Sequence, residues 1–369
     1  MKKITLTCII LLISIYSCKN IKTMEQSIVS VIPFEKINIT SEEINKISFY
    51  YNEGLYISNP IRGIFGISKN DIFLTIGEKA EEYNMPDKLS WESEFTQFLK
   101  NLTGEEVKDN LNNKKLEKRI FVNYKFNKIG KIILGNDKSI FIEHIKENGK
   151  EILKFSENGE FLYRIGLNGR DDQNLFTPET VIIKMYVNSE NGLWIKYSLN
   201  SMLYLKYYNK YGKNLIVLDE NSINNAINPY IPIKEGDFYQ IEDIFPLMNS
   251  VNIGIIVNVY KKNEKYNIKD KIYIELNKNL STENYWTFKE HEIVFFDINV
   301  NEQLVFLSYL PEENSNIVYV VDKDGKLIYE KKILLRKFNA KKVDLFLSAE
   351  GILTGIYRKD DNLVIIQWK

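Results

Sequence analysis

Few side chains in this 369-residue sequence have the types and spacing that catalysis requires. Histidine occurs only at His144 and His291, which is too few for a histidine metal cluster. Adjacent carboxylates, which suit acid–base chemistry on sugars, occur at Asp171–Asp172, Glu312–Glu313 and Asp360–Asp361. Neighbouring carboxylates on turns are usually solvated, and no glycine-rich phosphate loop is present. The sequence therefore predicts no catalytic residue, no metal site and no cofactor.

The segment Asp322–Gly325 has the acidic spacing with which a calcium-binding loop begins. It lacks the later acidic ligands of such a loop, and Asp324-Gly325 stands between two strand-like runs. We therefore expect a hairpin turn at this point.

Cys18 is the residue for which the sequence predicts a covalent modification. Two lysines follow Met1, Ile4–Ile15 is an apolar run too short to span a bilayer, and Ser17 is a small residue directly before the cysteine. This pattern resembles a bacterial lipoprotein signal, which implies cleavage before Cys18 and lipidation of its sulfur. An ordinary secretory signal and an uncleaved anchor are the alternatives. We expect a signal peptide over 1–17 and a lipidated tether over 18–26.

The composition limits the class of partner. Lysine plus arginine and aspartate plus glutamate are balanced at 49 each, whereas a nucleic-acid partner normally requires a basic face. We therefore expect no nucleic-acid partner. Cys8 and Cys18 are the only cysteines, so the rest of the chain contains neither a disulfide nor a thiolate metal site. The abundance of tyrosine, phenylalanine and isoleucine favours strands.

Sets of short strands recur along the chain, and Lys154–Gly169 is the clearest unit. In it, two apolar-rich runs flank Asn158-Gly159, a dipeptide typical of hairpin turns. Comparable sets occupy 47–77, 120–166, 181–218, 239–288, 293–329 and 343–368. Even spacing of short strands predicts an all-β propeller with four-stranded blades.

The last set of strands is one strand short. The N-terminal run Ser27–Ile32 is β-prone and otherwise unassigned, so we expect it to form the outer strand of the last blade. Such closure removes an exposed sheet edge. Five complete sets and one shared set predict six blades over 27–369, with a seven-bladed ring as the alternative.

Several motifs carry a resemblance to a known repeat family. They are the hairpin 155–166, Gly169-Arg170, Phe176-Thr177-Pro178 and the strand Asn191–Ile195. In this order they are similar to NHL-type propeller repeats. Together with the cysteine signal they resemble a family of spirochaetal β-propeller lipoproteins, and this resemblance implies a lipid-anchored protein of the cell envelope.

The segment 78–119 interrupts the strand pattern and is rich in charge. Its apolar residues follow helical spacing after a possible N-cap at Ser90 and before Gly104: Trp91, Phe95, Phe98, Leu99 and Leu102. We expect a helical insertion that packs on the propeller. An exposed helix that docks a partner is the alternative. Lys100 is the only basic residue between Ser90 and Thr103, which favours a protein partner over a membrane.

Loops between blades gather on one face of a propeller and usually carry its function. Arg164, Arg170, Asp171 and Asp172 lie in or beside such a loop and form the candidate binding face, although a solvated connection is the alternative. We expect a lipid-anchored platform that binds an envelope protein, on the outer membrane or on the periplasmic face of the inner membrane. A propeller enzyme acting on glycans or small molecules at the central funnel is the alternative, and a purely structural surface antigen is a third.

Overall fold

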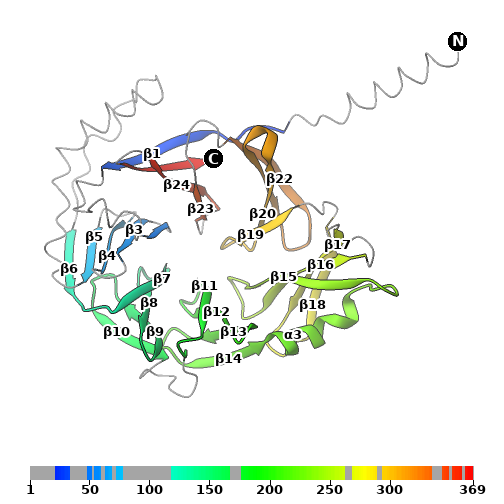
Figure 1. The fold of residues 1–369 in the computed structure, drawn as a ribbon, viewed down its shortest axis with the longest axis horizontal. Helices are drawn as coiled ribbons and strands as arrows, with labels where there is room; N and C mark the ends of the chain where they lie inside the picture. The colour runs from blue at the N-terminus through cyan, green and yellow to red at the C-terminus, as the bar shows by residue number, and fades with distance from the viewer. Residues whose placement is uncertain are drawn as a thin grey trace, which may run out of the picture.

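The computed structural model describes residues 21–33, 48–51, 54–59, 63–68, 72–77, 118–166, 176–261, 268–288, 293–334, 343–348, 351–359 and 362–368. Strands in these segments form six sheets arranged as a ring around a central axis (Figure 1). Five of the sheets are four-stranded and antiparallel, with the first strand of each set nearest the axis and the last at the periphery. The chain is therefore an all-β propeller, as the strand spacing predicts.

The strands of the five four-stranded blades follow one another along the chain, except that the last blade takes its outer strand from the N-terminus. One blade contains β7 (Lys128–Leu134), β8 (Ile140–Lys146), β9 (Gly149–Phe155) and β10 (Phe161–Gly166). The next contains β11 (Val181–Val187), β12 (Leu193–Leu199), β13 (Met202–Tyr208) and β14 (Asn214–Asp219). A third contains β15 (Phe238–Pro246), β16 (Ile253–Tyr260), β17 (Ile268–Leu276) and β18 (Thr282–Thr287). A fourth contains β19 (Val294–Ile298), β20 (Leu304–Leu310), β21 (Ser315–Val321) and β22 (Leu327–Leu334). The last contains β23 (Asp344–Leu347), β24 (Leu353–Lys359), β25 (Asn362–Trp368) and β1 (Gln26–Pro33).

The remaining sheet has five strands, and its last strand corrects an expectation. It contains β2 (Ser48–Tyr51), β3 (Gly54–Asn59), β4 (Gly63–Ser68), β5 (Ile72–Gly77) and β6 (Lys118–Asn123). The sequence assigned 120–124 to the following blade, but β6 instead pairs in parallel with β5. Parallel neighbours need a long crossover, and the segment 78–117 is long enough to provide it. The helix expected after Ser90 lies outside the described residues.

The two chain ends pair with each other, as the missing strand predicts. β1 runs antiparallel to β25, from Gln26 opposite Trp368 to Pro33 opposite Asn362. The N-terminal chain is bound even before β1 begins. Lys22 and Met24 hydrogen-bond through their backbones to Lys332 on β22, the outer strand of the neighbouring blade. The segment 18–26, expected as a tether, therefore includes residues that are paired with the propeller.

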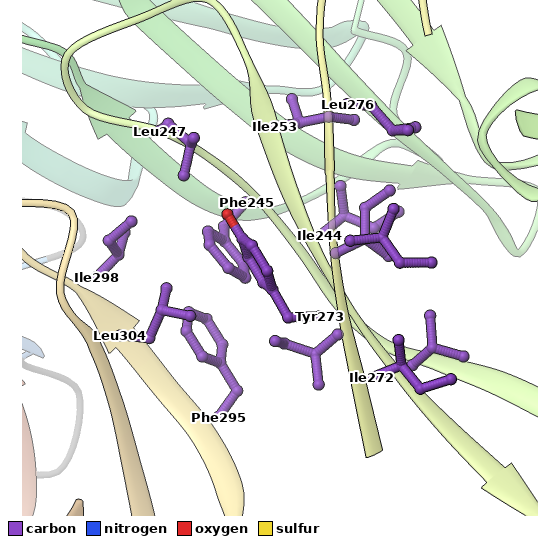
Figure 2. Packing of buried hydrophobic residues seen from close by; sticks show 14 of the residues in the cluster. Ile244, Phe245, Leu247, Ile253, Ile272, Tyr273, Leu276, Phe295, Ile298 and Leu304 are labelled. Atoms are coloured by element: carbon purple, nitrogen blue, oxygen red, sulfur yellow. The ribbon is translucent and has the colours of Figure 1, made fainter. Parts of the chain in front are cut away.

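The largest group of buried apolar side chains lies where the blades that begin with β11, β15 and β19 meet. The rings of Phe245 and Phe295 stack with their centroids 4.3 Å apart, and Tyr273 lies beside Phe245 in the same cluster (Figure 2). Gly254 makes this packing possible, since a Cβ atom there would stand 2.5 Å from the ring of Phe245. Each buried aromatic or aliphatic side chain contributes roughly 1.5–3 kcal/mol.

One short α-helix, α3 (Glu220–Ile227), lies between two blades in the described part of the chain, and it was not predicted from the sequence. Asp219 caps the helix by accepting the Ser222 N–H, and Ile223 and Ile227 pack into the main core. The described residues that follow contain two 3₁₀ turns, at Asn228–Tyr230 and Pro311–Glu313. Among the described residues, none of the helices has the length and hydropathy needed to cross a membrane.

Candidate functional site

Four of the inner strands carry a β-bulge at a similar place. The register shifts in β7 after Ile129, in β11 after Ile182, in β15 after Ile241 and in β19 after Phe295. A bulge inserts an extra residue and re-aims the side chains beside it. In three of the four strands the first paired residue after the bulge is charged: Lys184, Asp243 and Asp297. The repeated bulge therefore places charged side chains on the strands nearest the axis (Figure 1).

These charges form ion pairs between different blades. Lys184 Nζ on β11 lies 2.7 Å from Asp297 Oδ1 on β19. This pair therefore links two blades that are separated along the chain by the blade of β15 to β18. Lys196 on β12 pairs with Asp243 on β15. Each aspartate also accepts the backbone N–H of the residue that follows it, at 2.6 Å from Ile244 and 2.9 Å from Ile298. We call Lys184, Lys196, Asp243, Asp297 and Tyr186 the axial cluster.

Tyr186 is the most deeply buried member of the axial cluster. Burial raises the pKa of its phenol well above the usual value, and the negative charges of Asp243 and Asp297 raise it further. Its Oη atom has no hydrogen-bond partner among the described residues, and Lys184 Nζ lies 4.8 Å from its ring centroid. The phenol therefore stays protonated and cannot act as a general base.

A second buried pair lies within the blade that begins with β15, and one of its members is a residue of the β15 bulge. Glu242, the extra residue of that bulge, accepts the backbone N–H of Phe295 at 2.7 Å through Oε1. Its other oxygen pairs with Lys271 on β17, whose side chain is only 1% exposed. Burial lowers the pKa of the Lys271 ammonium, and the hydrogen bond and charge of Glu242 act in the opposite direction. Glu242 therefore ties two neighbouring blades together and stabilises a buried cation.

The axial arrangement is suited to holding blades together. A general base or a nucleophile needs a free lone pair that faces a substrate. Here Asp243, Asp297 and Glu242 each pair with a lysine and also accept a backbone N–H. In the described part of the chain, no three His, Cys, Asp or Glu side chains are grouped closely enough to hold a metal ion.

Of the residues that the sequence placed on a binding face, the structure locates Arg164. It lies on β10, the outer strand of its blade, with its guanidinium 3.6 Å from Glu151 Oε2 and 5.3 Å from the ring centroid of Phe161. The positive charge of Arg164 therefore stabilises the buried carboxylate of Glu151 near the periphery of the ring. Arg170, Asp171 and Asp172 lie outside the described residues, as do Cys18 and His291.

Glu151 is fully buried, and three basic side chains surround it. His144 Nδ1 lies 3.0 Å and Lys146 Nζ 2.7 Å from Oε1, while Arg164 faces Oε2. The Asn127 N–H donates to His144 Nε2 at 3.0 Å, so the neutral ring carries its hydrogen on Nδ1 and donates it to Glu151. Both nitrogens of His144 are thus engaged. The only sequence signal for this cluster was charged residues within the apolar runs of β8 and β9.

The Glu151 cluster predicts a specific dependence of stability on pH. Burial alone would raise the pKa of Glu151, but hydrogen bonds from His144 and Lys146, with the Lys146 and Arg164 charges, hold it below the usual range. A carboxyl with a lowered folded-state pKa stabilises the fold above its unfolded-state pKa, about 4.3. That stability is lost as the pH falls through the folded-state pKa. We expect Glu151→Gln to cost about 2 kcal/mol at pH 7, with the difference from wild type shrinking below pH 4. Urea denaturation at several pH values measures it, and a difference constant with pH would contradict the assignment.

The comparisons with known proteins do not extend beyond general architecture. No protein-family model and no curated protein matches the chain. Luciferin-regenerating enzyme has a TM-score of 0.41 and 9% identity, with 92% of this chain and 94% of that one covered. The Dos1 propeller has a TM-score of 0.34 and 8% sequence identity, and the alignment covers 94% of this chain and 95% of that one. The WD40 domain of Toxoplasma gondii coronin has a TM-score of 0.41 and 6% sequence identity, and the alignment covers 94% of this chain and 86% of that one. Scores this low carry no argument about activity.

Proposed function

We propose that this protein is a lipid-anchored component of the cell envelope whose propeller serves as a protein-binding platform. One observation carries the proposal. The carboxylates on the inner strands β15 and β19 are paired with lysines, whereas more of the exposed large apolar side chains lie on the outer strands β10, β14, β18 and β22 than on the inner strands. A rigid ring with exposed apolar residues at its periphery is suited to binding another protein.

In this proposal the five-stranded sheet acts as the sixth blade, with β6 as an addition to it. The seven-bladed alternative would require another four-stranded sheet, and the described residues form none beyond these six. The repeated hairpins and the cysteine signal support an NHL-like propeller of the spirochaetal lipoprotein type. Cys18 is then the lipidated residue, and the envelope is the place where the platform acts.

The partner surface that we favour spans two neighbouring blades. We call Phe161, Leu162, Tyr211, Leu215 and Val217 the rim patch, and all five are exposed. Tyr163 Oη on β10 donates to the Lys210 carbonyl at 3.2 Å, which joins β10 to the turn before β14. The apolar residues of both outer strands therefore lie in one region. Aromatic and aliphatic side chains of this kind form the centres of protein interfaces.

A pair of valine substitutions tests the platform against the enzyme alternative. Val217 is 49% exposed on the outer strand β14, and Val294 is 61% exposed on the inner strand β19. We expect Val217→Arg to abolish the capture of an envelope protein from solubilised membranes, because it places a charge in the rim patch. Val294→Arg should leave capture unchanged.

The opposite result would favour a function at the axis. The alternative of an enzyme acting on glycans or small molecules has one observation in its support, namely that Asp243 and Asp297 remain partly exposed on inner strands. If Val294→Arg removes capture while Val217→Arg does not, the rim platform is wrong. Quantitative mass spectrometry of the captured proteins, normalised to the wild type, gives the comparison.

A further inference from the structure

We infer that the outer edge of the blade that ends with β22 rests on the surface of the lipid bilayer. We call Lys323, Lys326, Leu327 and Ile328 the docking edge; Leu327 is 47% and Ile328 45% exposed. The inference rests on the proposed lipidation of Cys18. The inference goes beyond lipidation because it states which side of the propeller faces the membrane.

The first argument is where the N-terminal chain is held. The Met24 N–H donates to the Lys332 carbonyl at 2.8 Å, and the Lys332 N–H donates to the Lys22 carbonyl at 2.9 Å. The Met24 side chain is also buried, within the cluster beneath β22 and the last blade. The chain is therefore fixed to β22 from Lys22 onward, so only the residues before Lys22 can separate the lipid anchor from the propeller.

The second argument is the length and direction of the remaining chain. Only four residue steps separate Lys22 from Cys18, which corresponds to about 14 Å at full extension. Thr23 pairs with Lys332 in a parallel bridge. The N-terminal side of the chain is therefore directed toward the beginning of β22, where Leu327 lies. Acyl chains on Cys18 would hold this edge close to the headgroup layer.

The third argument is the chemistry of the edge itself. Leu327 and Ile328 are consecutive on a strand and project to opposite faces of the sheet. Two exposed lysines, Lys323 and Lys326, precede them in the turn, and Tyr285 is exposed on the outer strand of the neighbouring blade. Apolar residues flanked by lysine and tyrosine suit the boundary between headgroups and acyl chains. The apolar area is small, so the edge would dock only with the help of the anchor.

The turn that presents this edge is well ordered by its contacts. Asp322 accepts the backbone N–H groups of Asp324 and Lys326, as expected for a hairpin turn. Trp286 Nε1 donates to the Lys323 carbonyl at 2.9 Å, and Gly325 lies against the Trp286 ring so closely that a Cβ atom would come within 2.6 Å. The lysines and the two apolar residues are therefore held in place on the periphery of the ring.

Site-specific labels on the mature lipidated protein test the inference. Acylation blocks the thiol of Cys18, and Cys8 leaves with the signal peptide, so an introduced cysteine is the only reactive one. Leu327→Cys places a nitrobenzoxadiazole label at the docking edge. Leu215→Cys is the matched control, because Leu215 is 54% exposed on an outer strand across the ring (Figure 1). Both proteins are added to preformed phosphatidylethanolamine–phosphatidylglycerol vesicles, and dithionite reduction of the label is timed.

The inference predicts that reduction of the label at position 327 is several-fold slower on vesicles than in detergent, while the label at position 215 reacts equally fast in both. Equal reduction at both positions, in protein that floats with the vesicles, would overturn the docking edge and leave the anchor standing. Protection at position 215 instead would also overturn it. Failure of the protein to float would overturn the anchor and the docking edge together.

Discussion

A mature chain that lacks residues 19–33 is expected to lose cooperative folding and to aggregate. The deletion removes β1, which pairs with β25 over seven residue pairs, and also Met24 with its contacts beneath β22. It leaves the edge of β25 without its partner, and such an edge promotes association with other chains. We expect a larger loss than any single substitution causes. Thermal unfolding monitored by circular dichroism, together with light scattering, measures both effects.

A synthetic peptide provides the control for this deletion. Added in trans, residues 19–33 should restore part of the cooperative transition, because the peptide supplies both the backbone groups that pair with β25 and, at the right position, the buried Met24 side chain. A peptide with the same residues in scrambled order should not. A truncated chain that unfolds at the wild-type temperature would show that β1 does not close the ring.

Lys271→Met is expected to lower the free energy of unfolding by about 3–5 kcal/mol. The substitution keeps an unbranched side chain of similar length but removes the ammonium that pairs with Glu242, so a partly buried carboxylate is left without its counter-charge. Removal of one partner from a buried ion pair has this magnitude. Chemical denaturation gives the value. Lys278→Met, at an exposed turn, is the matched control and should change the stability little.

A double variant separates loss of the pair from loss of packing. Glu242→Gln combined with Lys271→Met removes both charges, and the glutamine oxygen can still accept the Phe295 N–H. We expect the double variant to recover most of the lost stability, because neutral partners carry no unpaired charge. If it remains as unstable as Lys271→Met alone, the loss comes from packing and the ion pair between Glu242 and Lys271 is not the cause.

The sequence predicted the blades well, because their signals are local. Asn158-Gly159 marks a hairpin, and apolar runs of strand length recur at even spacing. The outer strand of the last blade followed from counting, since one set lacked a strand and Ser27–Ile32 was left over. By contrast, β6 was assigned to the wrong sheet. Its parallel pairing with β5 depends on a crossover whose direction leaves no local pattern.

The helix α3 and the axial cluster could not be read from the sequence. The helix has few apolar residues, and only Ile223 and Ile227 among them are buried. The axial pairs join residues far apart in the chain: Lys196 and Asp243 are 47 positions apart. Their alignment also depends on β-bulges, which shift the register by one residue without a sequence signature. Arg164 was singled out for its charge, but its buried partner Glu151 was not recognised.

Metabolic labelling with a clickable fatty acid tests most directly whether the propeller is a lipid-anchored envelope protein. The wild type should carry the label and sediment with membranes, and Cys18→Ser should carry none and leave the membrane fraction. Unlabelled wild-type protein, or undiminished labelling of Cys18→Ser, would contradict the account.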